Sequence, residues 1–300
     1  MRVIDSHVHT WTRHILSQRD IDARILSAKR SGVEPVLDSP ASALLHAMKC
    51  AGVERAVILP IDSGLTQDMP LTLSEKTDWH VSEIEGHPEL ITFVGIDPRR
   101  GGEGIRELRR AVTERGCRGL KLYPPNGFYP DDEKFYPYYE LATELGIPVV
   151  IHQGFTSRFK YVKYARPVFV DKVATDFPEL RIVIAHVGIP WHEEALMVAA
   201  KNPNVYVDLS GWQIYAAGAP NRLFQMLLEA AITRVFPNRV LWGSDYPLFE
   251  HVLPLPEWVS FFVNLRVPEY LVESVGRRIR SGDIESIMWR NSSELFFGES

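Results

Sequence analysis

Four histidines and one aspartate stand at the ends of short apolar runs in the sequence. His7 and His9 close the first run, His152 and His186 close two later runs, and Asp245 closes the last one. Imidazole and carboxylate groups are ligands that Zn²⁺ and related divalent ions take in proteins. A centre with three or four such ligands and one open position makes water more acidic, which allows hydrolysis or proton transfer near neutral pH. The pattern therefore predicts a metal centre that can support catalysis.

Taken one at a time, these residues also fit structural roles. A single histidine at a strand end is commonly a hydrogen-bonded polar residue, and Asp245 in Gly-Ser-Asp-Tyr-Pro could cap a turn. Their joint placement favours the metal centre, because residues two apart in a strand point to the same side and His7 and His9 then project together. Lys121, inside Gly-Leu-Lys-Leu-Tyr, is either a buried ion-pair partner or a further residue of the site.

Eight apolar runs rich in Val, Ile and Leu predict parallel strands that are buried on both faces. They span residues 3–9, 55–61, 91–97, 119–123, 148–153, 181–187, 205–209 and 240–245. Helical spacing of apolar residues lies between them at 42–51, 104–114, 132–145, 169–177, 193–201 and 222–236. This alternation predicts an α/β protein, a (β/α)8 TIM barrel that forms a single domain over residues 1–300. In such a barrel, catalytic groups come from the C-terminal ends of several strands, where the histidines and Asp245 lie.

Two segments are longer than a barrel requires. Residues 10–38 follow the first strand and predict a lid-like insertion over the site, and residues 268–297 predict one or two helices that close the barrel. The main alternative is a doubly wound open sheet, which usually carries a Gly-rich phosphate loop after its first strand. In this chain His7-Val8-His9 occupies that position, so the barrel is the better prediction.

Composition excludes several functional classes. Of the 300 residues 45% are apolar, so the chain has enough surface to bury and is not disordered, and its net charge of -5 argues against a nucleic-acid-binding or polybasic membrane protein. The longest charge-free stretches, 145–157 and 209–221, have 13 residues, short of the roughly 18–20 that span a bilayer. No apolar secretory segment precedes His7, and Cys50 and Cys117 are the only cysteines. We therefore expect a cytoplasmic protein without structural disulfides.

Several motifs along the whole chain resemble the amidohydrolase superfamily. The matching segments are 5–9 (Asp-Ser-His-Val-His), 119–124 (Gly-Leu-Lys-Leu-Tyr-Pro), 150–152 (Val-Ile-His), 185–188 (Ala-His-Val-Gly), 243–247 (Gly-Ser-Asp-Tyr-Pro), 287–291 (Ile-Met-Trp-Arg-Asn) and 295–296 (Leu-Phe). They resemble most the amidohydrolase-related branch that contains the aminocarboxymuconate-semialdehyde and resorcylate-type decarboxylases. This resemblance is specific about the superfamily and the fold, and it says less about the reaction.

The resemblance implies a role for each matching residue. His7, His9 and His152 would bind the metal through their imidazoles, Asp245 would be a further ligand or the base for a water molecule, and His186 would be an acid/base catalyst beside the metal. In two-metal relatives of the dihydroorotase type, the lysine that matches Lys121 is carboxylated and bridges the ions. We expect one Zn²⁺ or another divalent ion rather than two, with Lys121 as a ligand in the two-metal alternative.

The segments after the strands are rich in aromatic residues, which suits a planar or cyclic ligand. The candidates for substrate contact are Trp11, Tyr123, Trp191 and Trp212, together with Arg158, whose guanidinium could bind a carboxylate through two hydrogen bonds. Packing of the barrel rim and a solvated surface position are the structural alternatives for these residues. Together they favour a small carboxylated substrate that is cyclic or derived from an aromatic compound.

Three functional hypotheses follow. The first is a decarboxylase-like lyase or a hydrolase of such a substrate, dependent on a metal. The second is a dihydroorotase-like two-metal hydrolase of a lactone or a cyclic amide. The third, from another class, is a barrel that binds a metal or a ligand without turnover, against which the presence of His186 and Asp245 argues. Barrels that resemble this chain are commonly dimers, so we expect a homodimer that binds neither nucleic acid nor membranes.

Overall fold

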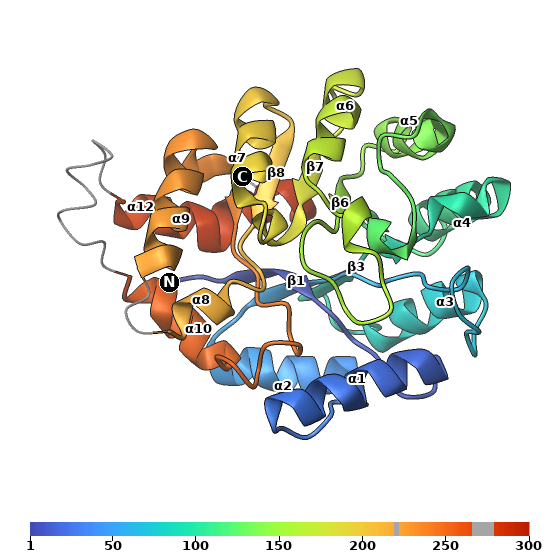
Figure 1. Cartoon of the computed structure of the whole chain (residues 1–300), viewed down its shortest axis with the longest axis horizontal. Coiled ribbons are helices and arrows are strands. Elements are labelled where there is room, and N and C mark those ends of the chain that lie inside the picture. Colours follow the sequence, from blue (N-terminus) through green and yellow to red (C-terminus); the bar gives the residue numbers. More distant parts are fainter. Residues whose placement is uncertain (219–221, 266–278, 300) are drawn as a thin grey trace.

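A ring of short parallel strands forms the centre of the computed structural model of this chain, and helices lie around it (Figure 1). The structure describes residues 1–218, 222–265 and 279–299. Within them the strands are β1 (Ile4–Val8), β2 (Arg55–Ile58), β3 (Leu90–Thr92), β4 (Val94–Gly95), β5 (Leu120–Leu122), β6 (Val149–Ile151), β7 (Ile182–Ile184), β8 (Val205–Asp208) and β9 (Val240–Leu241). They pair in parallel as two sheets, β1 to β3 and β4 to β9, each in chain order.

The two sheets join at both ends and so close the ring. Only Phe93 separates β3 from β4, so these two strands occupy one barrel position, which the sequence predicted as a single strand. At the other join, the Ser6 amide donates to the Trp242 carbonyl at 3.1 Å, and the His9 amide donates to the Tyr246 carbonyl at 2.8 Å. These bonds link β1 to the end of β9. The predicted (β/α)8 barrel is confirmed, with strands shorter than the apolar runs.

Alternating residues of each strand face two separate cores. In β2, Val57 points into the ring, whereas Ala56 and Ile58 belong to the outer core under the helices. The buried inner cluster consists of Val57, Leu59, Ile91, Phe93, Val150, Val183, Ala185, Leu241, Leu295 and Phe296. The last two residues belong to the C-terminal helical segment, which therefore fills one end of the barrel. Burial on both faces explains why these strands are continuously apolar in sequence.

The described helices are α1 (Gln18–Ser31), α2 (Ala41–Ala51), α3 (Leu73–Glu83), α4 (Gly102–Thr113), α5 (Tyr136–Glu144), α6 (Val168–Asp176), α7 (His192–Lys201), α8 (Gln213–Ala216), α9 (Arg222–Arg234), α10 (Leu255–Val263) and α12 (Ser281–Glu285). The six predicted helical segments correspond to α2, α4, α5, α6, α7 and α9. Each contributes one buried side to the outer core, and this periodic burial made them visible in the sequence.

Helix α3 was not predicted, because it is polar for most of its length. Only Leu73, Thr77 and His80 of this helix are buried. Its start does carry a recognisable signal: the Thr72 hydroxyl accepts from the Glu75 amide, and the Glu75 carboxylate accepts from the Thr72 amide. This reciprocal capping box marks a helix start even where apolar periodicity is weak.

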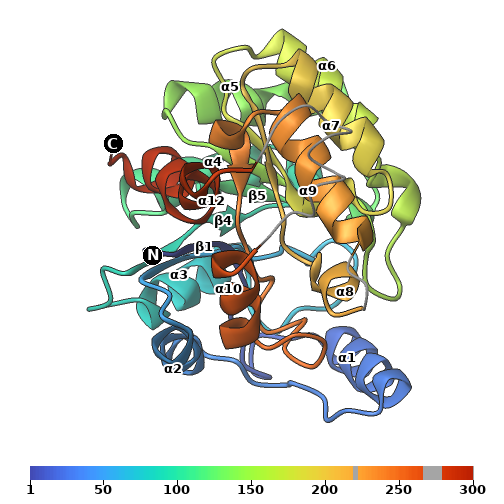
Figure 2. The ribbon, with the colours of Figure 1, turned by 90° about the vertical axis from the view of Figure 1, so that its left-hand side faces the viewer.

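The segment 10–38, predicted as an insertion over the site, contains α1. Trp11 and Ser39 pair across the base of this segment in an antiparallel bridge, so it leaves and re-enters the barrel at one point. Figure 2 shows α1 and α8 on the side of the molecule opposite to the two chain termini. Since β1 runs from the N-terminus toward α1, this is the side on which the strands end.

The C-terminal prediction, 268–297, lies partly outside the described residues. From Ser281 to Phe297 the described chain is helical, first as α12 and then as two π-helical turns, Ser286–Arg290 and Ser293–Phe297. None of the described helices is both long and apolar enough to cross a lipid bilayer.

Candidate metal centre

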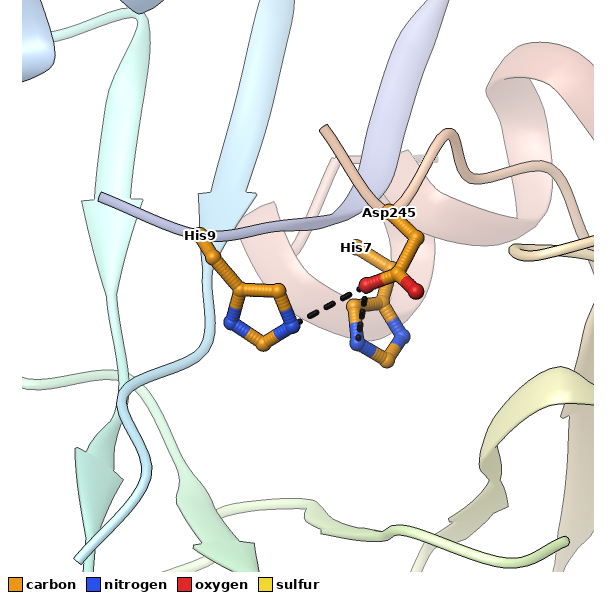
Figure 3. Close-up of side chains that lie close together, drawn as sticks. All are labelled: His7, His9 and Asp245. Carbon is orange, nitrogen blue, oxygen red and sulfur yellow. Dashed lines mark ion pairs between the residues drawn. The ribbon is translucent and has the colours of Figure 1, made fainter. Parts of the chain in front are cut away.

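His7, His9 and Asp245 meet where β1 and β9 end (Figure 3). The Oδ1 atom of Asp245 lies 3.0 Å from Nε2 of His9 and 3.7 Å from Nε2 of His7. The backbone enforces this approach, because the Asp245 amide donates to the His7 carbonyl at 2.8 Å. Gly243 permits it, since a Cβ at that position would lie only 2.9 Å from Cβ of His7.

His152 and His186 join this group from the ends of β6 and β7. His152 follows β6 and His186 follows β7, and Nδ1 of His152 lies 3.1 Å from Nε2 of His186. The ring centroids of His7 and His186 are 4.8 Å apart. The structure therefore brings together the four predicted histidines and Asp245, all of them buried.

The backbone is strained at this centre. Asp245, His186 and Val187 have φ angles of 57°, 61° and 44°, in the left-handed region that costs non-glycine residues about 1–2 kcal/mol each. Surrounding hydrogen bonds hold this conformation: the indole Nε1 of Trp212 donates to the His186 carbonyl at 2.8 Å, and the His186 amide donates to Asp208 Oδ1 at 3.0 Å. Strain of this kind clusters at functional sites, where it directs a side chain.

The hydrogen bonds on the outer sides of the imidazoles define which ring nitrogen carries the proton. His9 Nδ1 lies 2.8 Å from the Leu59 carbonyl, and His152 Nε2 lies 2.9 Å from the Phe155 carbonyl. A carbonyl oxygen only accepts, so each of these nitrogens must donate. In the neutral rings the inner nitrogens, His9 Nε2 and His152 Nδ1, then present lone pairs.

Asp208 and Ser210 define the protonated nitrogen of the His7 and His186 rings. His7 Nδ1 donates to Asp208 Oδ2 at 3.0 Å. His186 Nδ1 faces the Ser210 carbonyl at 3.2 Å and the Ser210 hydroxyl at 2.8 Å, and that hydroxyl donates to Asp208 Oδ1. The inner nitrogens, His7 Nε2 and His186 Nε2, are thereby left as lone pairs.

The ligand atoms of His7, His9 and Asp245 lie within 4.8 Å of one another in a buried space, and the lone pairs of His152 and His186 lie beside this group. Within the described part of the chain His7 Nε2 has no hydrogen-bond partner, and the lone pairs of His152 and His186 face each other at 3.1 Å. Electron pairs that face one another repel unless a cation lies between them. Outer hydrogen bonds that fix the tautomer are the usual setting of metal-binding histidines. The donor set of imidazoles and one carboxylate therefore fits Zn²⁺ or a similar divalent ion.

Burial keeps the imidazoles of His7, His152 and His186 uncharged, as metal binding requires. Loss of hydration lowers the pKa of His7 to about 3 and also lowers the pKa of His152 and His186. For Asp245, burial opposes ionisation, but its contact with His9 and the neighbouring imidazoles hold its pKa below the usual value. Neutral imidazoles next to an ionised carboxylate are the protonation states that bind a divalent cation.

Lys121 lies in the middle of β5 and is almost completely buried. Its Nζ has no hydrogen-bond partner among the described residues. Burial lowers its pKa to about 8, while the charges of Asp208 and Asp245 act in the opposite direction. The Lys121 amine therefore interacts electrostatically with Asp208 and Asp245 but forms no direct ion pair with either of them.

The predicted substrate-contact residues fall into three groups. Tyr123 is buried beside the centre, with its ring centroid 4.6 Å from that of His152, and Trp11 is buried two residues beyond His9. Trp212 is buried and bonded to the His186 backbone. Trp191, half-buried at the start of α7, lies under the Arg166 guanidinium, and Arg158 is exposed.

Asp208 and Ser210 are the residues that sequence reasoning missed. Asp208 ends β8 and lies one residue before the end of the strand predicted at 205–209, so the rule that singled out the histidines would also have found this carboxylate. Its role was not visible, because the partners of Asp208 lie 201 and 22 residues away in the sequence. Polar residues at every strand end of a barrel are therefore worth considering together.

Comparison with known proteins identifies the family of this chain. A family model described as amidohydrolase matches residues 4–298. Among curated proteins, the chain is 35% identical over 107 residues to a 2-keto-4-carboxy-3-hexenedioate hydratase from Sphingobium sp.. That match covers 29% of this chain and only 31% of the hydratase, so it spans about a third of the relative's length.

Solved structures share the whole architecture. A 5-carboxyvanillate decarboxylase from Sphingomonas paucimobilis has a TM-score of 0.66 and 17% identity, with 99% of each chain covered. An amidohydrolase from Burkholderia multivorans with bound zinc has a TM-score of 0.70 and 17% identity, also with 99% of each chain covered. At these identities the likeness is one of fold.

Proposed function

This chain belongs to the amidohydrolase family, and on that premise we propose that it is a metal-dependent enzyme of the decarboxylase-like or hydrolytic type. Its substrate would be a small carboxylated compound that is cyclic or derived from an aromatic ring. The cluster of His7, His9 and Asp245, with His152 and His186 next to it, carries this proposal. A barrel that needed these histidines only for packing would not turn the free electron pair of each ring inward.

In this proposal His7, His9, His152 and Asp245 hold one divalent ion, with Zn²⁺ as the first candidate. When bound, the ion supplies Lewis acidity, which polarises a substrate oxygen and makes water a better nucleophile. Asp208 orients the His7 ring, because its carboxylate takes the Nδ1 proton. The carbonyls of Leu59 and Phe155 do the same for His9 and His152.

His186 and Asp245 are the proposed proton carriers. His186 presents Nε2 toward the centre while Ser210 holds its Nδ1 side, so a proton can be taken up or delivered at Nε2. In hydrolysis, Asp245 would accept the proton of the attacking water, and His186, once protonated at Nε2, would polarise the carbonyl under attack. In decarboxylation, His186 would first take up a proton from solvent at Nε2 and then deliver it to the carbon that CO₂ leaves. The same groups would also support hydration of a double bond.

Known relatives support this substrate class without identifying the substrate. The partial relative is named for a carboxylated keto acid, and one neighbour of the same fold is named for a carboxylated aromatic ring. The buried aromatic rings of Tyr123 and Trp11 beside the centre fit a planar ligand. Trp191, Trp212 and Arg158 stay predictions as contact residues.

A two-metal hydrolase of a lactone or a cyclic amide is the second candidate, and the buried amine of Lys121 favours it. Carboxylation of this amine would create a bridging ligand. A second group of possible metal ligands, His7, His186 and Asp208, does not support a second ion. The Nδ1 atoms of the two imidazoles already form hydrogen bonds with Asp208 and Ser210, so they offer no free electron pair to a metal.

Elemental analysis of protein purified without added metal or chelator tests the proposal first. We expect about one divalent ion per chain, and release of CO₂ or water-dependent ring opening in a screen of carboxylated aromatic, muconate-like and cyclic substrates. About two ions and a carboxylated Lys121 would select the two-metal hydrolase. No metal even after reconstitution would refute both, and it would favour a barrel that binds a ligand without turnover.

We also propose a cytoplasmic homodimer that binds neither nucleic acid nor membranes. The moderate negative net charge of -5 supports the absence of a nucleic-acid partner. Analytical ultracentrifugation tests the oligomeric state, with a single species of twice the chain mass of 34.2 kDa as the expected result.

A further inference from the structure

Arg24 of α1 forms no ion pair with a carboxylate of the described residues, although the charge of Asp20, one helical turn away, acts on it. Its guanidinium carbon lies 3.5 Å from the centroid of the Trp11 ring, and its Nε is sealed from solvent without a hydrogen bond to any described residue. By contrast, Arg13 in the same segment is bonded to Asp38 at 2.8 Å. A half-buried guanidinium without an ion pair is costly, because stacking on an indole ring replaces only part of its lost hydration.

Two aromatic residues place Arg24 at the edge of the candidate metal centre. Trp11, on which it stacks, follows His9 by two residues. Arg24 is also close enough to Asp20 and to Tyr123 for electrostatic interactions, and the Tyr123 ring lies 4.6 Å from the His152 ring. Arg24 therefore lies near two rings that each neighbour a metal-ligand candidate, Trp11 after His9 and Tyr123 beside His152.

Lys160 is a second cation at this edge, and it too lacks an acidic partner. Its Nζ lies 6.0 Å from the centroid of the Tyr123 ring and donates to Asn126 Oδ1 at 2.6 Å, Thr66 Oγ1 at 3.1 Å and Ser63 Oγ at 3.2 Å. All three acceptors are neutral. Among the described residues no carboxylate forms an ion pair with Lys160 or with Arg24.

The nearby acids balance these charges only in part. Asp97 is held by Arg99 through two hydrogen bonds of 2.9 and 2.6 Å. Asp20 accepts hydrogen bonds from neutral groups, and its single negative charge acts on both Arg24 and Lys160. Arg19 and Lys76 add further positive charge close to Lys160. The edge of the centre next to Tyr123 therefore carries an excess of positive charge.

We propose that Arg24 and Lys160 form an anion-binding subsite for a carboxylate of the substrate that does not react at the metal. This rests on the proposed function and deepens it, because the substrate would then carry at least two acidic groups or one acidic group besides the bond that is broken. A guanidinium and an ammonium near Tyr123 would hold the planar ring of such a substrate in one orientation.

The segment that carries Arg24 is attached to two neighbouring loops. Besides the Trp11–Ser39 bridge at its base, Gln67 donates to Asp20 at 2.8 Å, and the Arg19 guanidinium lies 4.8 Å from the centroid of the Phe159 ring. These contacts join α1 to the loops after β2 and β6. In this arrangement the insertion contributes a substrate-binding residue rather than only a cover.

Binding of two unreactive probes tests the subsite. Isothermal titration of the metal-loaded full chain compares benzene-1,3-dicarboxylate with benzoate, because the two differ by one carboxylate. A charge-assisted pair contributes about 1.5–3 kcal/mol, so we expect roughly 10- to 100-fold tighter binding of the dicarboxylate. Arg24→Gln should abolish most of this preference and leave benzoate binding unchanged.

Three further proteins sharpen the experiment. Lys160→Met should also reduce the preference, Arg24→Lys should retain part of it, and Arg13→Gln should leave it intact because Arg13 is paired with Asp38. Metal content and thermal unfolding of every variant are measured in parallel, so that a folding defect is recognised. If Arg24→Gln fails to fold, Lys160→Met and Arg24→Lys test the same subsite.

The outcomes separate this inference from the proposed function. Equal binding of the two probes by the metal-loaded wild type, or an unchanged preference in both Arg24→Gln and Lys160→Met, overturns the subsite while the metal centre stands. Binding of neither probe up to millimolar concentration overturns it as well. Absence of metal refutes the proposed function, but an Arg24-dependent preference measured in that protein would still support the subsite.

Discussion

The candidate metal centre and its cationic edge, formed by Arg24 and Lys160, differ in how their polar side chains are paired. At the centre, every imidazole has a hydrogen bond on its outer side, and strained backbone at His186 and Asp245 directs the side chains inward. At the edge, Arg24 and Lys160 come from α1 and from the loop after β6, and in the described part of the chain neither forms an ion pair with a carboxylate. The donor groups of the centre fit a cation, whereas the charges of the edge fit an anion.

The difference teaches how the fold divides two tasks. Strand ends of the barrel are fixed on both sides by neighbouring strands, so they suit groups that need accurate placement. Connecting segments are less constrained and differ in length, so they suit groups that select a ligand. Changes at the centre should therefore affect metal and turnover, and changes at the edge should affect which ligand binds.

Removal of two ligands should have the largest effect. We expect His7→Ala combined with His9→Ala to abolish stoichiometric metal binding, because β1 and the residue after it then provide no imidazole ligand. The measurement is metal content by elemental analysis. His14→Ala is the matched control, since this exposed histidine lies in the adjacent insertion. Full metal content in the double variant would refute the ligand assignment.

His186→Asn should separate catalysis from metal binding. The variant retains a hydrogen-bonding group of similar size but loses the proton carrier, so we expect turnover to fall about 10²–10⁴-fold while one metal ion remains bound. Steady-state kinetics and elemental analysis measure the two quantities on the same sample. Loss of one metal equivalent from two would instead support the two-metal hydrolase.

Asp208→Asn should have an intermediate effect, because Asp208 acts through its neighbours. The carboxylate takes the Nδ1 proton of His7 and accepts the His186 amide, so its loss should loosen both rings. We expect metal affinity to fall about 10–100-fold, measured by competition with a chelator. Unchanged affinity would show that the barrel alone orients His7. Asp22→Asn, at an exposed position of α1, is the control.

The smallest expected effect is a pH dependence confined to the edge. Burial lowers the pKa of Lys160 to about 8, so its positive charge is present below this pH and is lost as the pH rises through it. The groups that face Lys160 are Asn126, Ser63, Thr66, Arg19, Asp20, Asp97 and Lys76. The preference for the dicarboxylate probe should therefore decline above pH 8, by about tenfold or less.

Lys160→Arg provides the control for this pH dependence. A guanidinium stays charged over the whole range, so the preference should become independent of pH between about 7 and 9. A decline that persists in Lys160→Arg would assign the titration to another group and contradict the role of Lys160. Titration calorimetry at several pH values measures both proteins.

Much of the architecture was predictable from sequence, because the barrel strands are buried on both faces and therefore read as apolar runs. His7, His9, His152, His186 and Asp245 were found by the same reading, since each one interrupts an apolar run at its end. Helix α3 was not predicted, because few of its residues are apolar and buried. The long strand predicted at 91–97 is divided at Phe93, which no local preference indicated.

The sequence by itself determined the family, the barrel and the residue types at the strand ends. Tertiary structure alone decided which nitrogen of each imidazole faces inward, because His7 and His186 receive this information from Asp208 and Ser210, up to 203 residues away in the chain. It also decided which cations form ion pairs: Arg13 pairs with Asp38, whereas Arg24 stacks on the indole ring of Trp11. Hydrogen-bond partners and charge balance depend on distances between remote segments, and only the closed barrel sets those distances.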